Sequence, residues 1–413
     1  MKNYKLFEVS GIELEYMLVD AGTLAVRPIA DQFLTLFGGA PDDVTRGSVT
    51  WCNELASHVI EVKTTQPQSS MVETETIFRK AIADAQPTLD ALNLKLLPTA
   101  MHPWMDPERE AMLWPHENAE IYSTYDRIFN CRSHGWCNVQ SVHLNLPFEN
   151  DADFKRLHAA IRILLPLLPA LAASSPITGL KHHGILDSRL EHYAQHCSAI
   201  PSLIGRVIPE RVFNESDYRD RILEPIKRDI APHDTDGVMA TDFLNARGAI
   251  ARFDRGSIEI RLLDIQEHPT ADVAICALIE HTLKALVHEE TAPVAKQIAF
   301  STDELRLILD ANTIEAEHTY LTNQAYLALF GLSKSIRAGE FWEHMIQNFE
   351  SSGKMADCFK KPLQLITNQG TLATRILKRA QCMQGKSEFL EEEIRRLYRE
   401  FADCLENGTS FQP

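Results

Sequence analysis

Four segments of the chain alternate polar and apolar residues with a period of two: residues 11–19, 57–64, 141–147 and 257–264. Successive side chains of a strand point to opposite faces of a sheet, so this period is typical of a half-buried β-strand. Each segment is also rich in β-branched or aliphatic residues, which favour strands. The pattern therefore predicts four strands, each with one apolar and one polar face.

Helical spacing of apolar residues dominates elsewhere, over roughly 72–95, 153–173 and 187–197, and over almost everything after residue 270. Strands and helices thus occur in separate blocks, without the strict alternation of a doubly wound sheet. This order predicts an α+β architecture with a mainly antiparallel sheet. We expect helices on its apolar face and an open cleft on its polar face. A break in the helical pattern at 286–302 suggests a body of residues 1–290 and a helical region, 291–413, packed on it.

Carboxylates lie on the polar face of three predicted strands, at Glu13, Glu15, Glu61 and Glu259, and His143 occupies that face of the fourth. Carboxylates are seldom buried without a partner. Oxygen ligands with one imidazole suit Mg²⁺ or Mn²⁺. A Glu-x-Glu pair on a solvated edge strand is the alternative explanation for each segment taken alone. Repetition on four segments favours a divalent metal site.

The composition limits the classes of partner. The chain has 57 acidic and 41 basic residues, a formal charge of −16, and no Lys/Arg-rich run, which argues against nucleic acid. An acidic protein can bind a nucleotide when metal cations bridge its carboxylates to the phosphates. The longest apolar run, residues 163–173, contains two prolines and is shorter than the ~20 residues of a membrane span. We therefore expect a cytoplasmic protein with reduced thiols, either a monomer or a homo-oligomer.

Short motifs follow the predicted strands along the chain. They are Gly11-Ile-Glu-Leu-Glu, Glu54 with Glu61, His143-Leu-Asn145, Ala172-Ala-Ser-Ser-Pro176, Asp187-Ser-Arg189 and Glu259-Ile-Arg-Leu-Leu-Asp264. In this order, from about residue 9 to 269, they resemble the glutamate-cysteine ligase and carboxylate-amine ligase superfamily, in its bacterial and plant-type branch. The helical remainder of the chain carries no such motif.

The resemblance implies a glutamine-synthetase-like fold whose sheet binds ATP with Mg²⁺, or with Mn²⁺. It implies one ion at Glu13, His143 and Glu259, a second at Glu15 and Glu61, and a third at Glu54 with Glu13 and Glu259. Glu54 lies an odd number of positions before Glu61, so it must occupy the turn that enters the strand if both face the cleft. Arg261 would contact the γ-phosphate and, with Glu259, is the expected catalytic residue. A salt bridge from Arg261 to the neighbouring glutamates is the alternative.

Some cation must hold the α-carboxylate of the acid substrate. The candidates are Arg127, Arg189, Arg252 and Arg255. The last two lead directly into the Glu259 strand and are therefore better placed, and they are also nucleotide-binding candidates. Thr64 and Asn145 are further substrate-binding candidates. His192 and His196 are one helical turn apart, but they lack the spacing and the third ligand of a zinc site.

The resemblance implies an ADP-forming carbon-nitrogen ligase. The carboxylate of one substrate attacks the γ-phosphorus of ATP, an acyl phosphate forms, and an amine displaces phosphate. Glutamate is the expected acid and cysteine the expected single amine, although another amino acid, amine or peptide acceptor would fit equally well. A guanidino-kinase-like phosphotransferase and a non-catalytic nucleotide-binding regulatory protein are the alternatives.

Overall fold

The computed structural model describes residues 4–41, 43–239, 244–384 and 387–413. Its main sheet has the strand order β2-β3-β4-β1-β6-β8-β7, and β5 also pairs with β1. The strands are β1 (Gly11–Asp20), β2 (Val44–Arg46), β3 (Val49–Asn53), β4 (Val59–Thr64), β5 (Leu94–Leu97), β6 (Ser141–Pro147), β7 (Ala249–Arg252) and β8 (Ser257–Asp264). Every pairing is antiparallel. The four predicted strands are confirmed as β1, β4, β6 and β8, and they are neighbours at the centre of the sheet.

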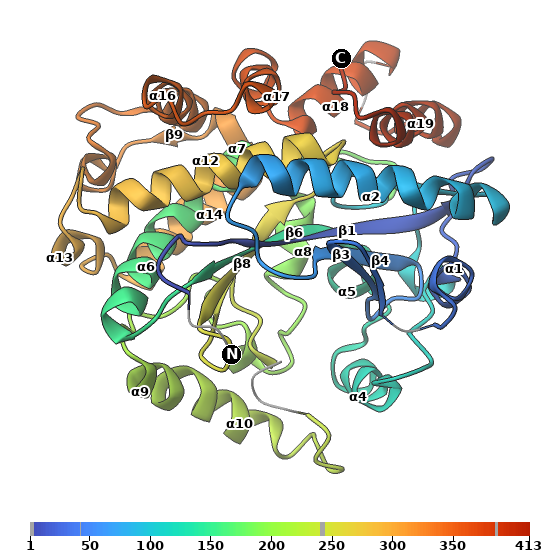
Figure 1. The fold of residues 1–413 in the computed structure, drawn as a ribbon, viewed down its shortest axis with the longest axis horizontal. Coiled ribbons are helices and arrows are strands. Elements are labelled where there is room, and N and C mark those ends of the chain that lie inside the picture. The colour runs from blue at the N-terminus through green and yellow to red at the C-terminus, as the bar shows by residue number, and fades with distance from the viewer. Residues whose placement is uncertain (1–3, 42, 240–243, 385–386) are drawn as a thin grey trace.

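The helices of the first three hundred residues surround this sheet. They are α1 (Ala30–Gly38), α2 (Met71–Ala91), α3 (Pro107–Glu110), α4 (Ala119–Phe129), α5 (His134–Cys137), α6 (Asp151–Leu164), α7 (Pro169–Ala172), α8 (Ser188–Tyr193), α9 (Glu215–Tyr218), α10 (Glu224–Ile230), α12 (Pro269–Val287) and α13 (Val294–Gln297). In Figure 1, α2 and α12 cross one face of the sheet, while α4, α9 and α10 lie on the opposite side.

The rest of the chain is mainly helical, as expected. It contains α14 (Thr302–Glu315), α15 (Gln324–Leu327), α16 (Ala338–Ser351), α17 (Asp357–Gln369), α18 (Leu372–Gln384) and α19 (Glu391–Asn407), with a small sheet of β9 (Tyr320–Leu321) and β10 (Ile336–Arg337). Helices α16 and α17 contact α12, and α19 contacts α2 and β5. Helices α16 to α19 thus form an outer layer over α2 and α12 (Figure 1), while α14 packs against α7 and α8. The division at residue 290 stays a prediction.

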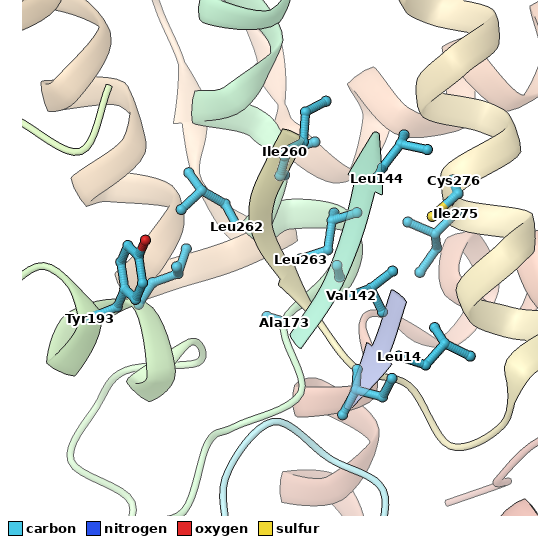
Figure 2. Packing of buried hydrophobic residues seen from close by; sticks show 14 of the residues in the cluster. Leu14, Val142, Leu144, Ala173, Tyr193, Ile260, Leu262, Leu263, Ile275 and Cys276 are labelled. Carbon is cyan, nitrogen blue, oxygen red and sulfur yellow. The ribbon is translucent and has the colours of Figure 1, made fainter. Parts of the chain in front are cut away.

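The main core lies between the apolar face of the sheet and α12. Figure 2 shows Leu14 of β1 and Val142 and Leu144 of β6 on the same side as Ile275 and Cys276 of α12. All five side chains are at most 2% exposed. Because apolar and polar residues alternate on these strands, burying this face leaves the carboxylates together on the other.

Three predicted helices differ from the structure in their bounds. The segment 72–95 ends as a helix at Ala91 and continues as β5, because Asn93 has a positive φ of 54° that turns the chain. Segment 153–173 is divided into α6, a short 3₁₀ turn and α7, since Pro166 and Pro169 cannot donate backbone hydrogen bonds. Segment 187–197 is helical only over α8. Among the described helices, none is both long and apolar enough to cross a bilayer.

Candidate active site

The strand register brings the polar side chains of β4, β1, β6 and β8 onto one surface. Glu13 pairs with Lys63 on one side and with His143 on the other, and Glu15 pairs with Glu61. Residues paired across neighbouring strands project to the same face, so these groups are adjacent. The four strand segments predicted from the alternating pattern therefore contribute to a single site.

One group of possible metal ligands consists of Glu13, His143 and Glu259, which offer ligand atoms within 4.8 Å of one another. Nδ1 of His143 lies 3.0 Å from Oε2 of Glu13 and 3.6 Å from Oε1 of Glu259. The amide Nδ2 of Asn145 donates to Oε1 of Glu13 at 3.1 Å, which fixes the orientation of that carboxylate. These are the three residues expected to hold one ion.

A second group consists of Glu15, Glu61 and His143. Ser141 fixes Glu15, because its backbone N–H and its hydroxyl both donate to Oε2, at 2.7 and 2.8 Å. Lys63 donates to Oε1 of Glu61 at 2.7 Å. Glu15 and Glu61 were expected to share an ion; the structure adds His143 to this group and gives Ser141 and Lys63 supporting contacts that no motif indicated.

Glu54 follows β3 on the loop that enters β4, as its odd offset from Glu61 required. Burial raises the pKa of Glu54 well above its usual range, and the charges of Glu61 and Glu15 raise it further. Its carboxylate neighbours therefore belong to the second group. An ion shared by Glu54 with Glu13 and Glu259 stays a prediction.

The electrostatics of the site favour a bound cation. Burial by itself would lower the pKa of His143, but the hydrogen bond to Glu13 and the charge of Glu15 raise it to about 9. Burial and the charge of Glu13 raise the pKa of Glu61. The carboxylates thus retain a proton on the imidazole to offset their mutual repulsion. Carboxylate oxygens with one imidazole are a ligand set that Mg²⁺ or Mn²⁺ accepts, so the residues present fit a divalent ion.

Arg261 and Arg189 bring positive charge to the same surface. Nε of Arg261 lies 3.0 Å from Oε1 of Glu259. Arg189 of α8 is 1% exposed, and its Nε donates to Oδ1 of Asp264 at 2.5 Å. Its Nη2 is buried and has no hydrogen-bond partner among the described residues. An unpaired buried guanidinium N–H is costly, so this group is ready to bind an anion.

Both arginines line a cleft of about 420 Å³ between the polar face of the sheet and helices α4, α5 and α8. Glu15, Glu54 and His143 lie on its sheet side. The opposite wall is aromatic and consists of Tyr122, Tyr125, Trp136, Tyr193 and His196. The polar face is thus partly covered by helices, where the sequence analysis expected it to be open. No alternating pattern marks this wall, because its residues come from α4, α5, α8 and the segment that follows α8.

A model of glutamate-cysteine ligase family 2 matches residues 9–400 of the chain. The chain belongs to this family. The resemblance stated from the strand motifs is therefore confirmed, and it extends through the helical remainder that carried no recognisable motif. The chain is also 32% identical over 402 residues to an uncharacterized protein of Archaeoglobus fulgidus, an alignment that covers 96% of this chain and 98% of that protein.

Solved structures agree with this family assignment at the level of the fold. A glutamate-cysteine ligase from Francisella tularensis, solved in complex with AMP, superposes with a TM-score of 0.62 at 14% identity, covering 98% of this chain and 90% of that one. A bifunctional glutathione synthetase from Pasteurella multocida gives 0.63 at 14% identity, covering 96% of this chain and 53% of that one. The fold expected from the sequence is confirmed.

In this member of glutamate-cysteine ligase family 2, three further arginines that were candidates for binding substrate or nucleotide lie outside the cleft. Arg252 pairs with Ser257 across the β7–β8 hairpin, on the face of Glu259, and both it and the more exposed Arg255 are ion-paired with Asp254. Arg127 of α4 donates to the carbonyl of His233. None of these three arginines lines the cleft, so the preference for Arg252 and Arg255 over Arg189 as the carboxylate clamp finds no support in the structure.

Thr64 and the histidine pair also differ from their sequence-based interpretation. Thr64 follows Lys63 on β4, so its side chain lies with Val62 on the apolar face of the sheet, which α2 and α12 cover, and points away from the carboxylates. His196 belongs to the cleft wall, while the ring of His192 lies 5.0 Å from that of His134. Among the described residues, the groups that could hold a metal do not include either histidine. Zinc therefore remains without support.

Proposed function

We propose that this protein is an ATP-dependent, ADP-forming carboxylate-amine ligase that makes an amide through an acyl phosphate. One observation carries the proposal: two groups of metal ligands share His143 on the polar face of the sheet, with Arg261 beside them. Membership of glutamate-cysteine ligase family 2 supports the same class of reaction.

The side chains divide the work of phosphoryl transfer. Glu13, His143 and Glu259 would hold one Mg²⁺ ion, and Glu15 and Glu61 a second, with Glu54 available beside them. A bound Mg²⁺ neutralises phosphate charge during the transfer. Arg261 would contact the transferring phosphoryl group, because a planar guanidinium makes two parallel hydrogen bonds to its oxygens. Arg252, at the edge of the same face, suits the remaining phosphates of ATP.

The reaction needs no nucleophilic side chain. A carboxylate oxygen of the acid attacks the γ-phosphorus of ATP, and the bond to the bridging oxygen breaks as ADP leaves. The amine nitrogen then attacks the acyl carbon, and phosphate leaves with the electron pair of the C–O bond. The protein contributes orientation and electrostatic stabilisation. We propose glutamate as the acid and cysteine or another amine as the acceptor.

Hydroxylamine tests this proposal without knowledge of the natural amine, because it converts an acyl phosphate into a stable hydroxamate. With glutamate, ATP and Mg²⁺, we expect hydroxamate to accumulate in proportion to ADP. Glu259→Gln should abolish both products together, while Glu350→Gln, an exposed change on α16, should alter neither. ADP without hydroxamate for every acid tried would reject the ligase. A stable phosphorylated guanidine would instead identify a kinase, and ATP binding without turnover a regulatory protein.

A further inference from the structure

The cleft beside the metal ligands has two walls of different chemistry. The sheet side carries charged groups, among them Glu15, Glu54 and Arg189. The other side presents Tyr122 and Tyr125 from α4, Trp136 from α5 and Tyr193 from α8. A ligase of the proposed kind must hold two substrates side by side, and the two walls offer them different environments.

Two polar groups of the aromatic wall are already engaged by the protein. Nε1 of Trp136 donates to the carbonyl of His196 at 3.0 Å, and the hydroxyl of Tyr193 donates to the carbonyl of Ala246 at 2.9 Å. The rings also support one another: Tyr125 and Trp136 lie 5.3 Å apart between centroids, and Trp136 and His196 4.7 Å apart. With these N–H and O–H groups occupied, the wall offers ring surface to a ligand. Ring surface binds apolar or aromatic groups.

Carboxylate-binding capacity in the cleft is limited. Within the described lining, Arg189 and Arg261 are the only lysine or arginine side chains, and Arg261 lies against Glu259. Arg189 has a buried, unpartnered Nη2, which suits the α-carboxylate of the acid substrate. An α-amino acid acceptor would bring a second α-carboxylate into the cleft, whose described lining holds no further arginine or lysine to pair with it.

We infer that the acceptor is a primary amine with an aromatic or otherwise apolar body and no carboxylate beside its nitrogen. The inference rests on the proposed function and specifies its second substrate. The body lies against Tyr122, Tyr125, Trp136 and Tyr193, and the amino group points to the sheet side. The ammonium loses one proton to solvent, and the free amine then attacks the acyl carbon. The nitrogen loses a second proton, to the departing phosphate, as the amide forms.

Three amines separate the contributions of ring and charge. Phenethylamine has the ring and the amine, ethylamine lacks the ring, and phenylalanine adds a carboxylate to phenethylamine. With glutamate, ATP and Mg²⁺, we expect kcat/KM for phenethylamine to exceed that for ethylamine by roughly 30-fold, the effect of burying a phenyl group. Phenethylamine should exceed phenylalanine and cysteine by at least about 10-fold, because both amino acids bring a carboxylate. Equal rates for the two simple amines, or a preference for either amino acid, overturn the inference.

A variant ties the preference to the aromatic wall. Tyr122 is only half-buried, so Tyr122→Ala should fold. We expect it to lower the ratio of kcat/KM for phenethylamine to that for hydroxylamine about 10-fold, since hydroxylamine makes no contact with a ring. Tyr320→Ala removes a 60% exposed tyrosine of β9, outside the cleft, and should leave the ratio unchanged. An unchanged ratio in Tyr122→Ala would overturn the placement of the amine.

Two outcomes distinguish this inference from the proposed function. If no hydroxamate forms with any acid, the ligase proposal fails, and calorimetry of phenethylamine binding to the wild-type protein still tests the cleft. Saturable binding weakened by Tyr122→Ala would support the aromatic site, and its absence would reject it. If hydroxamate forms faster from an aromatic acid than from glutamate, the wall holds the acid, and the inference about the amine is wrong.

Discussion

Nδ1 of His143 is within hydrogen-bonding distance of Oε2 of Glu13, at 3.0 Å, while Nε2 of the same ring faces Glu15 at 3.7 Å. One imidazole thus belongs to both groups of candidate metal ligands. We expect His143→Asn to weaken Mn²⁺ binding at both sites together and to lower kcat on the order of 100-fold. Electron paramagnetic resonance of Mn²⁺ would count the ions. His233→Asn, an exposed change, is the control. Loss of one ion with the other retained at full affinity would contradict a shared ligand.

A substitution at Arg261 tests whether the reaction needs a planar guanidinium or only a positive charge at this position. Arg261→Lys keeps the charge but loses the two parallel hydrogen bonds, so we expect kcat to fall on the order of 100-fold with little change in KM for ATP. Steady-state kinetics measure both constants. Arg228→Lys, on the exposed surface of α10, is the matched control. A raised KM with an unchanged kcat would place Arg261 in ground-state binding.

Arg189 can be tested with substrates alone. γ-Aminobutyrate keeps the carboxylate that is phosphorylated but lacks the α-carboxylate of glutamate. If Nη2 of Arg189 binds that group, γ-aminobutyrate should form hydroxamate roughly 100-fold less efficiently, because the buried guanidinium N–H is left unpaired. Arg189→Lys keeps the charge next to Asp264 and should reduce the difference between glutamate and γ-aminobutyrate in the efficiency of hydroxamate formation. Equal efficiency for the two acids in the wild type would remove Arg189 from substrate binding.

A buried ion pair joins the outer helical layer to the segment that follows β8. Nη1 of Arg375 in α18 donates to Oε1 of Glu267 at 2.7 Å, and each residue is 1% exposed. We expect Glu267→Gln or Arg375→Met alone to destabilise the protein by about 3–5 kcal/mol, since each leaves a charge buried without its partner. The double variant should lose less than the sum of the two. Urea denaturation of the wild type, the two single variants and the double variant measures the four free energies of unfolding. Strictly additive losses in this free energy would argue against a direct pair.

Acid should destabilise the fold through buried histidines. Burial and, to a lesser extent, the charge of Arg162 lower the pKa of His158 from 6.5 to about 3. The hydrogen bond to the carbonyl of Val212 acts in the opposite direction but does not offset them. The unfolded chain therefore binds more protons between these values, so the contribution of His158 is complete above pH 6.5 and is lost as the pH falls. At pH 5 the loss is about 2 kcal/mol. His158→Gln should flatten the decline in denaturation free energy below pH 6.5, while exposed His318→Gln should not.

The four central strands β4, β1, β6 and β8 could be predicted from the sequence, because apolar residues recur on one face of each strand and polar residues on the other. Strands β2, β3, β5 and β7 were missed, being short or lacking a polar partner face. The metal-ligand candidates Glu13, Glu15, Glu61, His143 and Glu259 share one face for the same reason. Their adjacency in space required the antiparallel register, which the sequence pattern implies but does not specify.

The aromatic wall could not be predicted in the same way. Tyr122, Trp136 and Tyr193 lie on three short helices, and each helix begins and ends within a long connection. A single aromatic residue on such a helix is more often a core residue, so no local pattern distinguishes these positions. Arg189 was one of four candidates, and the sequence favoured Arg252 and Arg255 over it for a similar reason: only the ion pair with Asp264 directs Arg189 to the cleft.

Strand β8 carries Glu259, Arg261 and Asp264, and Asp264 in turn holds Arg189. In the proposed mechanism, the centre for phosphoryl transfer lies on this strand, and the anchor for the far end of the acid is held by it. Their separation cannot adjust to a substrate of another length. An acid one methylene shorter than glutamate, such as aspartate, would misplace its reacting oxygen by about 1 Å, which costs roughly 100-fold in rate. Under this proposal a single strand would select the acid by its number of carbon atoms.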